Sequence, residues 1–166
     1  SDKKIKVCHL TSAHKANDIR IFHKEACSLA SSGLFEVYLI AVNAEEKQIN
    51  NVNIVSAKTK STSRLLRILN HSKAVYKKAL EIDAEIYHFH DPELLPYGLK
   101  LQRKGKIVIY DSHEDVPRQI LGKHWIPSIL RKTIATIYEK YEDYVSSKLS
   151  FIVVSTPSIK NRFSKV

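Results

Sequence analysis

The sequence is poor in the residues that mark several common binding sites. It contains four glycines, two cysteines, one tryptophan and no methionine among its 166 residues. No glycine lies in the turn after the first apolar strand, which argues against both the glycine-rich dinucleotide turn and the phosphate-binding P-loop. Cys8 and Cys27 stand far apart without a Cys-x-x-Cys spacing, so we expect small buried side chains in a reducing compartment.

Long hydrophobic runs are missing as well. No apolar segment approaches the roughly 18–20 residues of a membrane-spanning helix. The segment Ile5–Leu10 is too short and too polar for the core of a signal peptide, and we therefore expect a cytoplasmic protein. The lack of methionine, and a helical pattern in 158–166 without a residue that would end it, lead us to expect part of a longer protein.

Positive charge is in excess, with 27 basic residues, 17 acidic residues and a net charge of +10. Such an excess suits an anionic partner, although a solubilising surface would have the same composition. One stripe of the predicted helix 61–81 is basic, and it is an ordinary solvated face or a docking surface for anionic lipid or a phosphorylated ligand. Its residues are Arg64, Arg67, His71 and Lys78, with Lys60 and Lys77 close by. Since no nucleic-acid-binding motif is present, we expect no nucleic-acid partner.

Strands and helices alternate along the chain, which predicts an α/β fold. We expect strands at 4–10, 36–42, 52–57, 85–90, 106–110 and 151–154. We expect helices at 18–32, 61–81, 96–104 and 126–148, and a last one from 157, with an irregular stretch at 114–127. Pro92 and Pro96 favour a tight turn at 91–95 over a helix that begins at Pro92. This order predicts one Rossmann-like domain over 1–166, with a mostly parallel sheet and helices on both faces.

Two helices have apolar stripes that should face the core. In helix 126–148 the spacing is clean, and the stripe is Leu130, Ile134, Ile137, Tyr141, Tyr144 and Val145. In helix 61–81 the expected buried residues are Leu65, Leu69, Val75 and Ala79.

Two of the predicted strands end in the same residue types, histidine followed by carboxylates. One ends in His90-Asp91, and the other leads into His113-Glu114-Asp115. The carboxyl ends of parallel strands line the ligand crevice in open α/β sheets, so we expect function at this rim. Glu114 beside His113 could support a base or an electrostatic partner, whereas capping and turn chemistry would explain the acids without a function.

The histidines also permit a metal interpretation. His88 and His90 share one strand face, and with Asp91 and His113 they offer nitrogen and oxygen ligands. In a sheet covered on both faces, however, His88 is better explained as a core histidine with one satisfied hydrogen bond. We therefore predict no metal site. No Gly-x-Ser-x-Gly motif supports a serine nucleophile.

Several segments resemble the N-terminal half of bacterial family 4 glycosyltransferases of the GT-B fold. They are Lys6–Ser12, Asp18–Glu25, Tyr87–Pro96, Val108–Asp115 and Asp143–Ser155. The resemblance implies an acceptor-binding domain without a cofactor of its own, while a C-terminal domain outside this chain holds the nucleotide-sugar. It further implies metal-independent transfer with retention to a lipid-linked or polysaccharide acceptor, and peripheral contact with the inner face of an anionic membrane.

The resemblance also implies site residues. His113 corresponds to the histidine that reaches toward the donor sugar and diphosphate, and is the predicted catalytic residue. His90 and Asp91 correspond to the strand end that faces the cleft. The loop after the first strand supplies Ser12, His14, Asp18 and Arg20 as substrate-binding candidates, and the segment after the fifth strand supplies Glu114 and Arg118. Many relatives have a Gly-Gly pair in the first loop, which this sequence lacks, and Arg20 could clamp a phosphate instead.

Two alternatives remain open. The first is a nucleotide-sugar 2-epimerase of the same fold, although such enzymes usually carry a Gly-Thr-Arg-Pro-Glu turn where this sequence has Thr11-Ser12-Ala13-His14. The second is a non-catalytic module that binds phosphorylated ligands.

Overall fold

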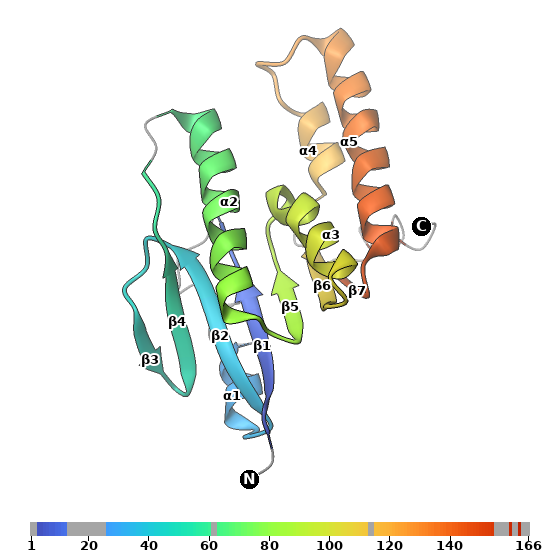
Figure 1. Ribbon diagram of the computed structural model, residues 1–166. Helices are drawn as coiled ribbons and strands as arrows, with labels where there is room; N and C mark the ends of the chain where they lie inside the picture. The colour runs from blue at the N-terminus through green and yellow to red at the C-terminus, as the bar shows by residue number, and fades with distance from the viewer. Residues whose placement is uncertain are drawn as a thin grey trace.

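The strands form one seven-stranded sheet in the order β3-β4-β2-β1-β5-β6-β7 (Figure 1). The computed structural model describes residues 3–12, 26–60, 63–112, 115–154, 160 and 163. The strands are β1 (Ile5–Leu10), β2 (Phe35–Val42), β3 (Lys47–Ile49), β4 (Val52–Ala57), β5 (Ile86–Phe89), β6 (Ile107–Ser112) and β7 (Phe151–Val154). The helices are α1 (Cys27–Ser31), α2 (Arg64–Ile82), α3 (Leu95–Arg103), α4 (Val116–Leu121) and α5 (Ser128–Lys148), with a 3-10 turn η2 (Pro92–Leu94).

All pairs of neighbouring strands are parallel except β3 with β4. The predicted Rossmann-like, mostly parallel sheet is therefore confirmed. The short edge strand β3 was not expected, because its three residues carry no apolar alternation. The signal for it was Asn50-Asn51, whose positive φ angles of 50° and 65° close a tight hairpin into β4.

Each face of the sheet has its own apolar cluster. On one face Leu10, Tyr87 and Phe89 are buried in the larger cluster, which also contains Val75 and Ala79 of α2. On the other face Val37 and Leu39 pack with Ala30 of α1 and with Ala26 at its N-terminal end. The alternation of side chains along β1 and β5 therefore sends His9 and His88 to the second face.

Helix α2 confirms the expected helix at 61–81, but its predicted buried stripe is only half right. Ser63 caps the helix, since its hydroxyl accepts a hydrogen bond from the backbone N–H of Leu66. Val75 and Ala79 are fully buried, whereas Leu69 is 57% exposed. The reason is visible in Figure 1, where the first turns of α2 project beyond the ends of the strands. The Leu65 side chain lies outside the described residues.

The proline argument about residues 91–96 is confirmed. Pro92 opens the 3-10 turn η2, and α3 then begins at Leu95 with Pro96 in its first turn. Gly98 lets α3 lie close to β5, because a Cβ atom there would come within 2.6 Å of the Phe89 ring.

The stretch expected to be irregular, 114–127, contains helix α4. Asp115 caps it by accepting a hydrogen bond from the backbone N–H of Arg118, and Pro117 stands in the first turn. Both are ordinary signals for the start of a helix. The prediction of an irregular stretch was wrong because it gave these two residues too little weight. The expected start of the helix 18–32 at Asp18 lies outside the described residues, as does most of the helix expected from 157.

The predicted core-facing stripe of α5 was wrong, because most of it lies on the surface. Of the expected residues only Val145 is buried, together with Ala135, Glu142 and Ser146 of the same helix. Glu142 orients the helix, since its carboxylate accepts hydrogen bonds from the hydroxyls of Tyr110 at 3.1 Å and Tyr138 at 3.4 Å. A buried carboxylate needs such partners, so this polar anchor sets which face of α5 is inside.

Candidate functional site

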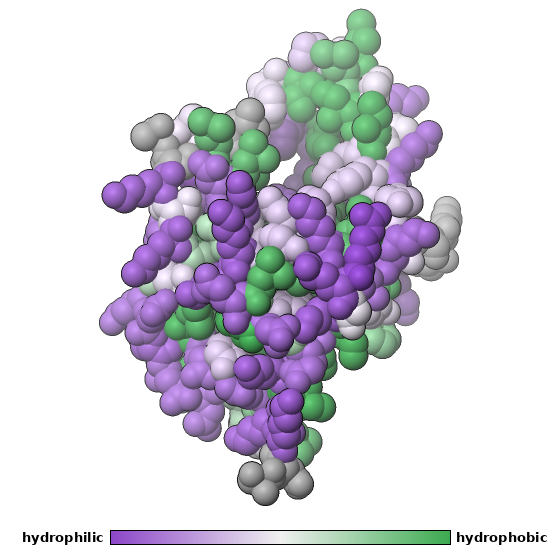
Figure 2. All heavy atoms as spheres, viewed as in Figure 1, coloured by the Kyte–Doolittle hydropathy of each residue, from purple (hydrophilic) through white to green (hydrophobic). Residues whose placement is uncertain are grey.

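The carboxyl ends of β1, β5 and β6 meet at one edge of the sheet, as the strand-end residues predicted. The N-terminal end of α2 rises on one side of this edge, and the hairpin of α4 and α5 rises on the other (Figure 1). Figure 2 shows the surface hollowed between these two projections. This edge is therefore the candidate site.

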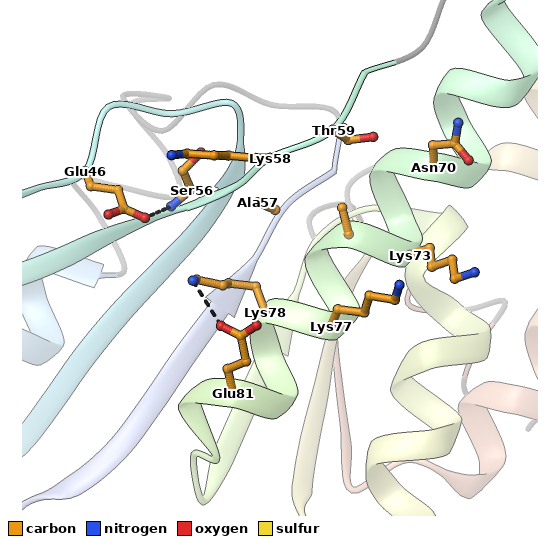
Figure 3. Close-up of a pocket in the computed structure, with 11 residues that line it drawn as sticks. Glu46, Ser56, Ala57, Lys58, Thr59, Asn70, Lys73, Lys77, Lys78 and Glu81 are labelled. Carbon is orange, nitrogen blue, oxygen red and sulfur yellow. Dashed lines mark hydrogen bonds and ion pairs between the residues drawn. The ribbon is translucent and has the colours of Figure 1, made fainter.

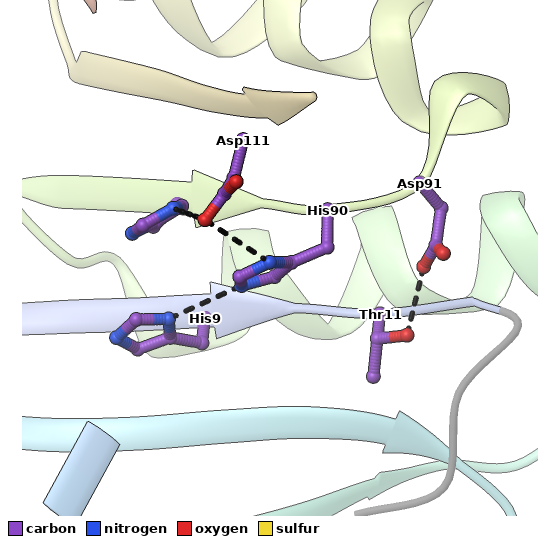
Figure 4. A network of polar contacts seen from close by, with 6 residues as sticks. His9, Thr11, His90, Asp91 and Asp111 are labelled. Carbon is purple, nitrogen blue, oxygen red and sulfur yellow. Dashed lines mark hydrogen bonds and ion pairs between the residues drawn. The ribbon is translucent and has the colours of Figure 1, made fainter. Parts of the chain in front are cut away.

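Asp91 holds the loop that leaves β1. Its carboxylate accepts a hydrogen bond from the Thr11 hydroxyl at 2.7 Å (Figure 4). It accepts another from the backbone N–H of Ser12 at 2.8 Å. The Ser12 hydroxyl donates to Glu93 at 3.0 Å, and Nδ1 of His71 lies 3.3 Å from the Ser12 carbonyl oxygen. Three elements therefore hold the first residues of the loop: Asp91 after β5, Glu93 on η2 and His71 on α2.

Next to these contacts of Asp91, three imidazoles and one carboxylate form a layer on one face of the sheet. They belong to His9, His88, His90 and Asp111. Nε2 of His88 is 3.1 Å from the Asp111 carboxylate, and Nδ1 of His90 is 3.6 Å from it. Nδ1 of His9 is 3.5 Å from Nε2 of His90, as Figure 4 shows. We call these four residues the histidine layer. His9, His90 and Asp111 are buried, and His88 is half-buried with the expected hydrogen bond.

Burial sets the protonation of His9. It lowers the pKa of His9 to about 3, and the neighbouring His88 adds to the effect while Asp111 opposes it. His9 is therefore neutral at physiological pH.

We expect acid to destabilise the fold through His9. An unfolded histidine titrates near pH 6.5, so below that pH the unfolded state takes up a proton that folded His9 refuses until about pH 3. His9 therefore leaves the free energy of unfolding unchanged above pH 6.5 and lowers it by about 1.4 kcal/mol per pH unit between pH 6.5 and about pH 3. Urea unfolding at several pH values should show a flatter acid limb in His9→Asn. The exposed His124→Asn variant is the control, and an equal loss in both variants and the wild type would refute this.

The histidine layer resembles a metal site in composition but not in geometry. Ligand atoms of His9, His88 and His90 lie within 4.8 Å of one another. The His90 ring stacks on both of the others, with interplanar angles of 14° to His88 and 17° to His9, while the His9 and His88 rings are tilted by 31° to each other. A metal ion lies in the plane of each imidazole that binds it, and stacked planes share no such point. In the described conformation the layer is a hydrogen-bonded stack, and the absence of a metal site stays a prediction.

The structure brings three of the predicted site residues together. Ser12, His90 and Asp91 are adjacent at the rim, and all three are buried, which suits residues that shape the site. Arg118 lies exposed on α4, with its Nε 3.8 Å from the Asp115 carboxylate. Five candidates lie outside the described residues, namely His14, Asp18, Arg20, His113 and Glu114. Sequence reasoning missed His9 and Asp111, although both stand in segments that carry the family resemblance, Lys6–Ser12 and Val108–Asp115.

A groove of about 630 Å³ lies between the end of β4 and α2 (Figure 3). Its basic residues are Lys58, Lys73, Lys77 and Lys78. Lys78 pairs with Glu81 at 3.0 Å, and Figure 3 shows the ammonium groups pointing in different directions. They do not converge on one point, so the groove is a basic surface rather than a built site for a single anion.

Comparison with known proteins identifies the fold. No family model and no curated protein matches the sequence. Among solved structures, the chain is similar to a sucrose-phosphate synthase from Thermosynechococcus elongatus, with a TM-score of 0.67 and 10% sequence identity. The match covers 98% of this chain and 45% of that structure, so the chain spans less than half of the matched protein. The Rossmann-like fold thus matches half of a GT-B glycosyltransferase, which is the fold that the resemblance implied.

Proposed function

We propose that this chain is the acceptor-side half of a glycosyltransferase that moves a sugar from a nucleotide-sugar to a lipid-linked or polysaccharide acceptor. The observation that carries the proposal is the rim at the carboxyl edge of the sheet. There the buried carboxylate of Asp91 fixes the start of the loop after β1, in a fold that matches half of a sucrose-phosphate synthase. The finer assignment, a retaining and metal-independent enzyme of family 4, rests on the sequence motifs.

The chemistry of transfer suits such a rim. Positive charge builds on the sugar and negative charge on the leaving diphosphate as the bond breaks, and preoriented polar groups that face these charges lower the barrier. His113 follows the end of β6, and the loop fixed by Asp91 leads to Arg20. We propose His113 for the donor sugar and diphosphate, and Arg20 for a phosphate of donor or acceptor. The edge between α2 and the α4–α5 hairpin would receive the acceptor.

The proposed setting is the cytoplasmic face of a membrane. A lipid-linked acceptor is held there, and a net charge of +10 favours approach to anionic lipid. Within the described residues no helix is long and apolar enough to cross a bilayer. The contact we propose is accordingly peripheral.

The test uses the complete protein with a panel of nucleotide-sugars, in the presence and absence of a membrane lipid extract. We expect nucleotide release that depends on the extract, with the sugar recovered in the lipid fraction. Recovery of an isomerised sugar would favour the 2-epimerase alternative. Binding of donors or phosphorylated ligands without turnover would favour a non-catalytic module.

A further inference from the structure

The outer face of α5 is apolar although it lies on the surface. Its exposed residues follow a regular spacing of four, three, four and three positions along the helix. They are Leu130 (49% exposed), Ile134 (40%), Ile137 (63%), Tyr141 (41%) and Tyr144 (53%). We call these five residues the outer stripe. Apolar side chains at helical spacing are typical of a face that is covered by something else.

The apolar surface continues past the beginning of the helix. Trp125 is 79% exposed and Ile129 is 85% exposed, and Leu121 at the end of α4 is 48% exposed. We call these three residues the tip. Figure 2 shows apolar side chains gathered at the top of the molecule, over the α4–α5 hairpin. The backbone there is held by Arg131, whose Nε donates to the Ile126 carbonyl oxygen at 2.7 Å.

Charges on α5 are sorted by burial. Its exposed charged side chains are all lysines, at positions 132, 140 and 148. Its acidic residues, Glu139, Glu142 and Asp143, are half-buried or buried. The outer side of the helix thus combines apolar and aromatic side chains with positive charge, a composition that favours an anionic interface.

We propose that the tip and the outer stripe dock on an anionic lipid surface, with α5 lying in the plane of the interface. Trp125, Tyr141 and Tyr144 have the amphipathic rings that settle at the level of lipid headgroups. Lys148 lies at the stripe, with its Nζ 5.7 Å from the centroid of the Tyr144 ring, and Lys140 stands on its flank, so both can reach headgroup phosphates. Lys132 lines the groove toward α4 instead. This surface differs from the basic stripe of α2, where His71 is turned toward Ser12 and Lys78 is paired with Glu81.

A second copy of the chain fits this face less well. Two helices that pair through such a stripe gain specificity from opposite charges along its flanks. Here the exposed charges nearest the stripe are Lys140 and Lys148, so two copies would bring like charges together. The tip also extends the apolar surface beyond the helix, which a bilayer can cover more easily than a partner helix.

The test is flotation of the full-length protein with two kinds of vesicle. One is pure phosphatidylcholine, and the other contains about 30% phosphatidylglycerol as the anionic lipid. We expect binding to the anionic vesicles that weakens at high salt. Trp125→Ser with Ile129→Ser should lower the partition coefficient at least about tenfold, as should Ile137→Ser with Tyr141→Ser. Leu34→Ser is the matched control, since Leu34 is 69% exposed at the amino end of β2, and should bind like the wild type.

Three results would overturn the proposal. The first is equal binding by all the variants, and the second is no binding by the wild type. The third is a dimer in gel filtration that the stripe variant converts to a monomer without any vesicle binding, which would assign the face to a second copy. The assay needs no donor or acceptor, so its failure would leave the proposed transfer reaction to be judged by its own turnover test.

Discussion

Alanine at position 113 in the complete protein is expected to lower kcat at least about 100-fold. We propose that the His113 imidazole faces the donor sugar and diphosphate, where charge develops as the glycosidic bond breaks. Removal of one preoriented hydrogen-bond donor of this kind typically costs about 10²–10³ in rate. Donor turnover measured at saturating acceptor would report the loss, and a KM that stays near the wild-type value would place the effect in the transition state.

The interpretation requires that the variant remains folded. His113 follows directly after β6, whose backbone pairs with β5 at 107–110 and with β7 at 109–112, before that position is reached. Thermal unfolding of His113→Ala should therefore coincide with that of the wild type. A second variant, His113→Asn, keeps an N–H donor and should recover part of the activity. Wild-type turnover in the alanine variant would remove His113 from the site.

The Asp91→Ala substitution is expected to cost about 2–4 kcal/mol of unfolding free energy. The carboxylate is 2% exposed and accepts hydrogen bonds from Thr11 and Ser12, and truncation would leave both donors buried without it. Urea unfolding measures the loss. Turnover should fall as well, because the loop after β1 would lose its fixed start.

Glu93→Ala is the matched control for this prediction. Glu93 lies two residues away on η2 and accepts from the Ser12 hydroxyl, but the pair is only partly buried. Its loss should cost less than about 1 kcal/mol. Equal destabilisation by the two substitutions would show that Asp91 is not the principal anchor of the loop.

The sequence predicted those parts of the fold in which local pattern and tertiary packing agree. The parallel strands were found because each is a short apolar run between turn residues, and the break before α3 followed from the spacing of Pro92 and Pro96. The edge strand β3 and helix α4 are too short for a periodic signal. Their signals were single turn and cap residues, Asn50-Asn51 and Asp115.

The orientation of α5 shows why periodicity alone fails for some helices. The cleanest apolar stripe lies outside, because Glu142 bonds to Tyr110 from the opposite face of the helix. A sequence pattern cannot show that a carboxylate has a buried partner on a strand far along the chain. The candidate site was predicted in position, since His90 and Asp91 lie at the expected rim. The use of Asp91 to fix the β1 loop depends on a contact between distant segments, which no local pattern reveals.

The place of β1 in the middle of the sheet has a consequence for how the protein is made. One edge of β1 can pair with β2 soon after both leave the ribosome, but its other partner, β5, follows only after β3, β4 and α2. A nascent chain at that stage carries an open strand edge with unpaired backbone groups, which is a template for association with other chains. Synthesis that pauses before Ile86 would therefore favour aggregation, and early binding of a chaperone to β1 would protect the growing chain.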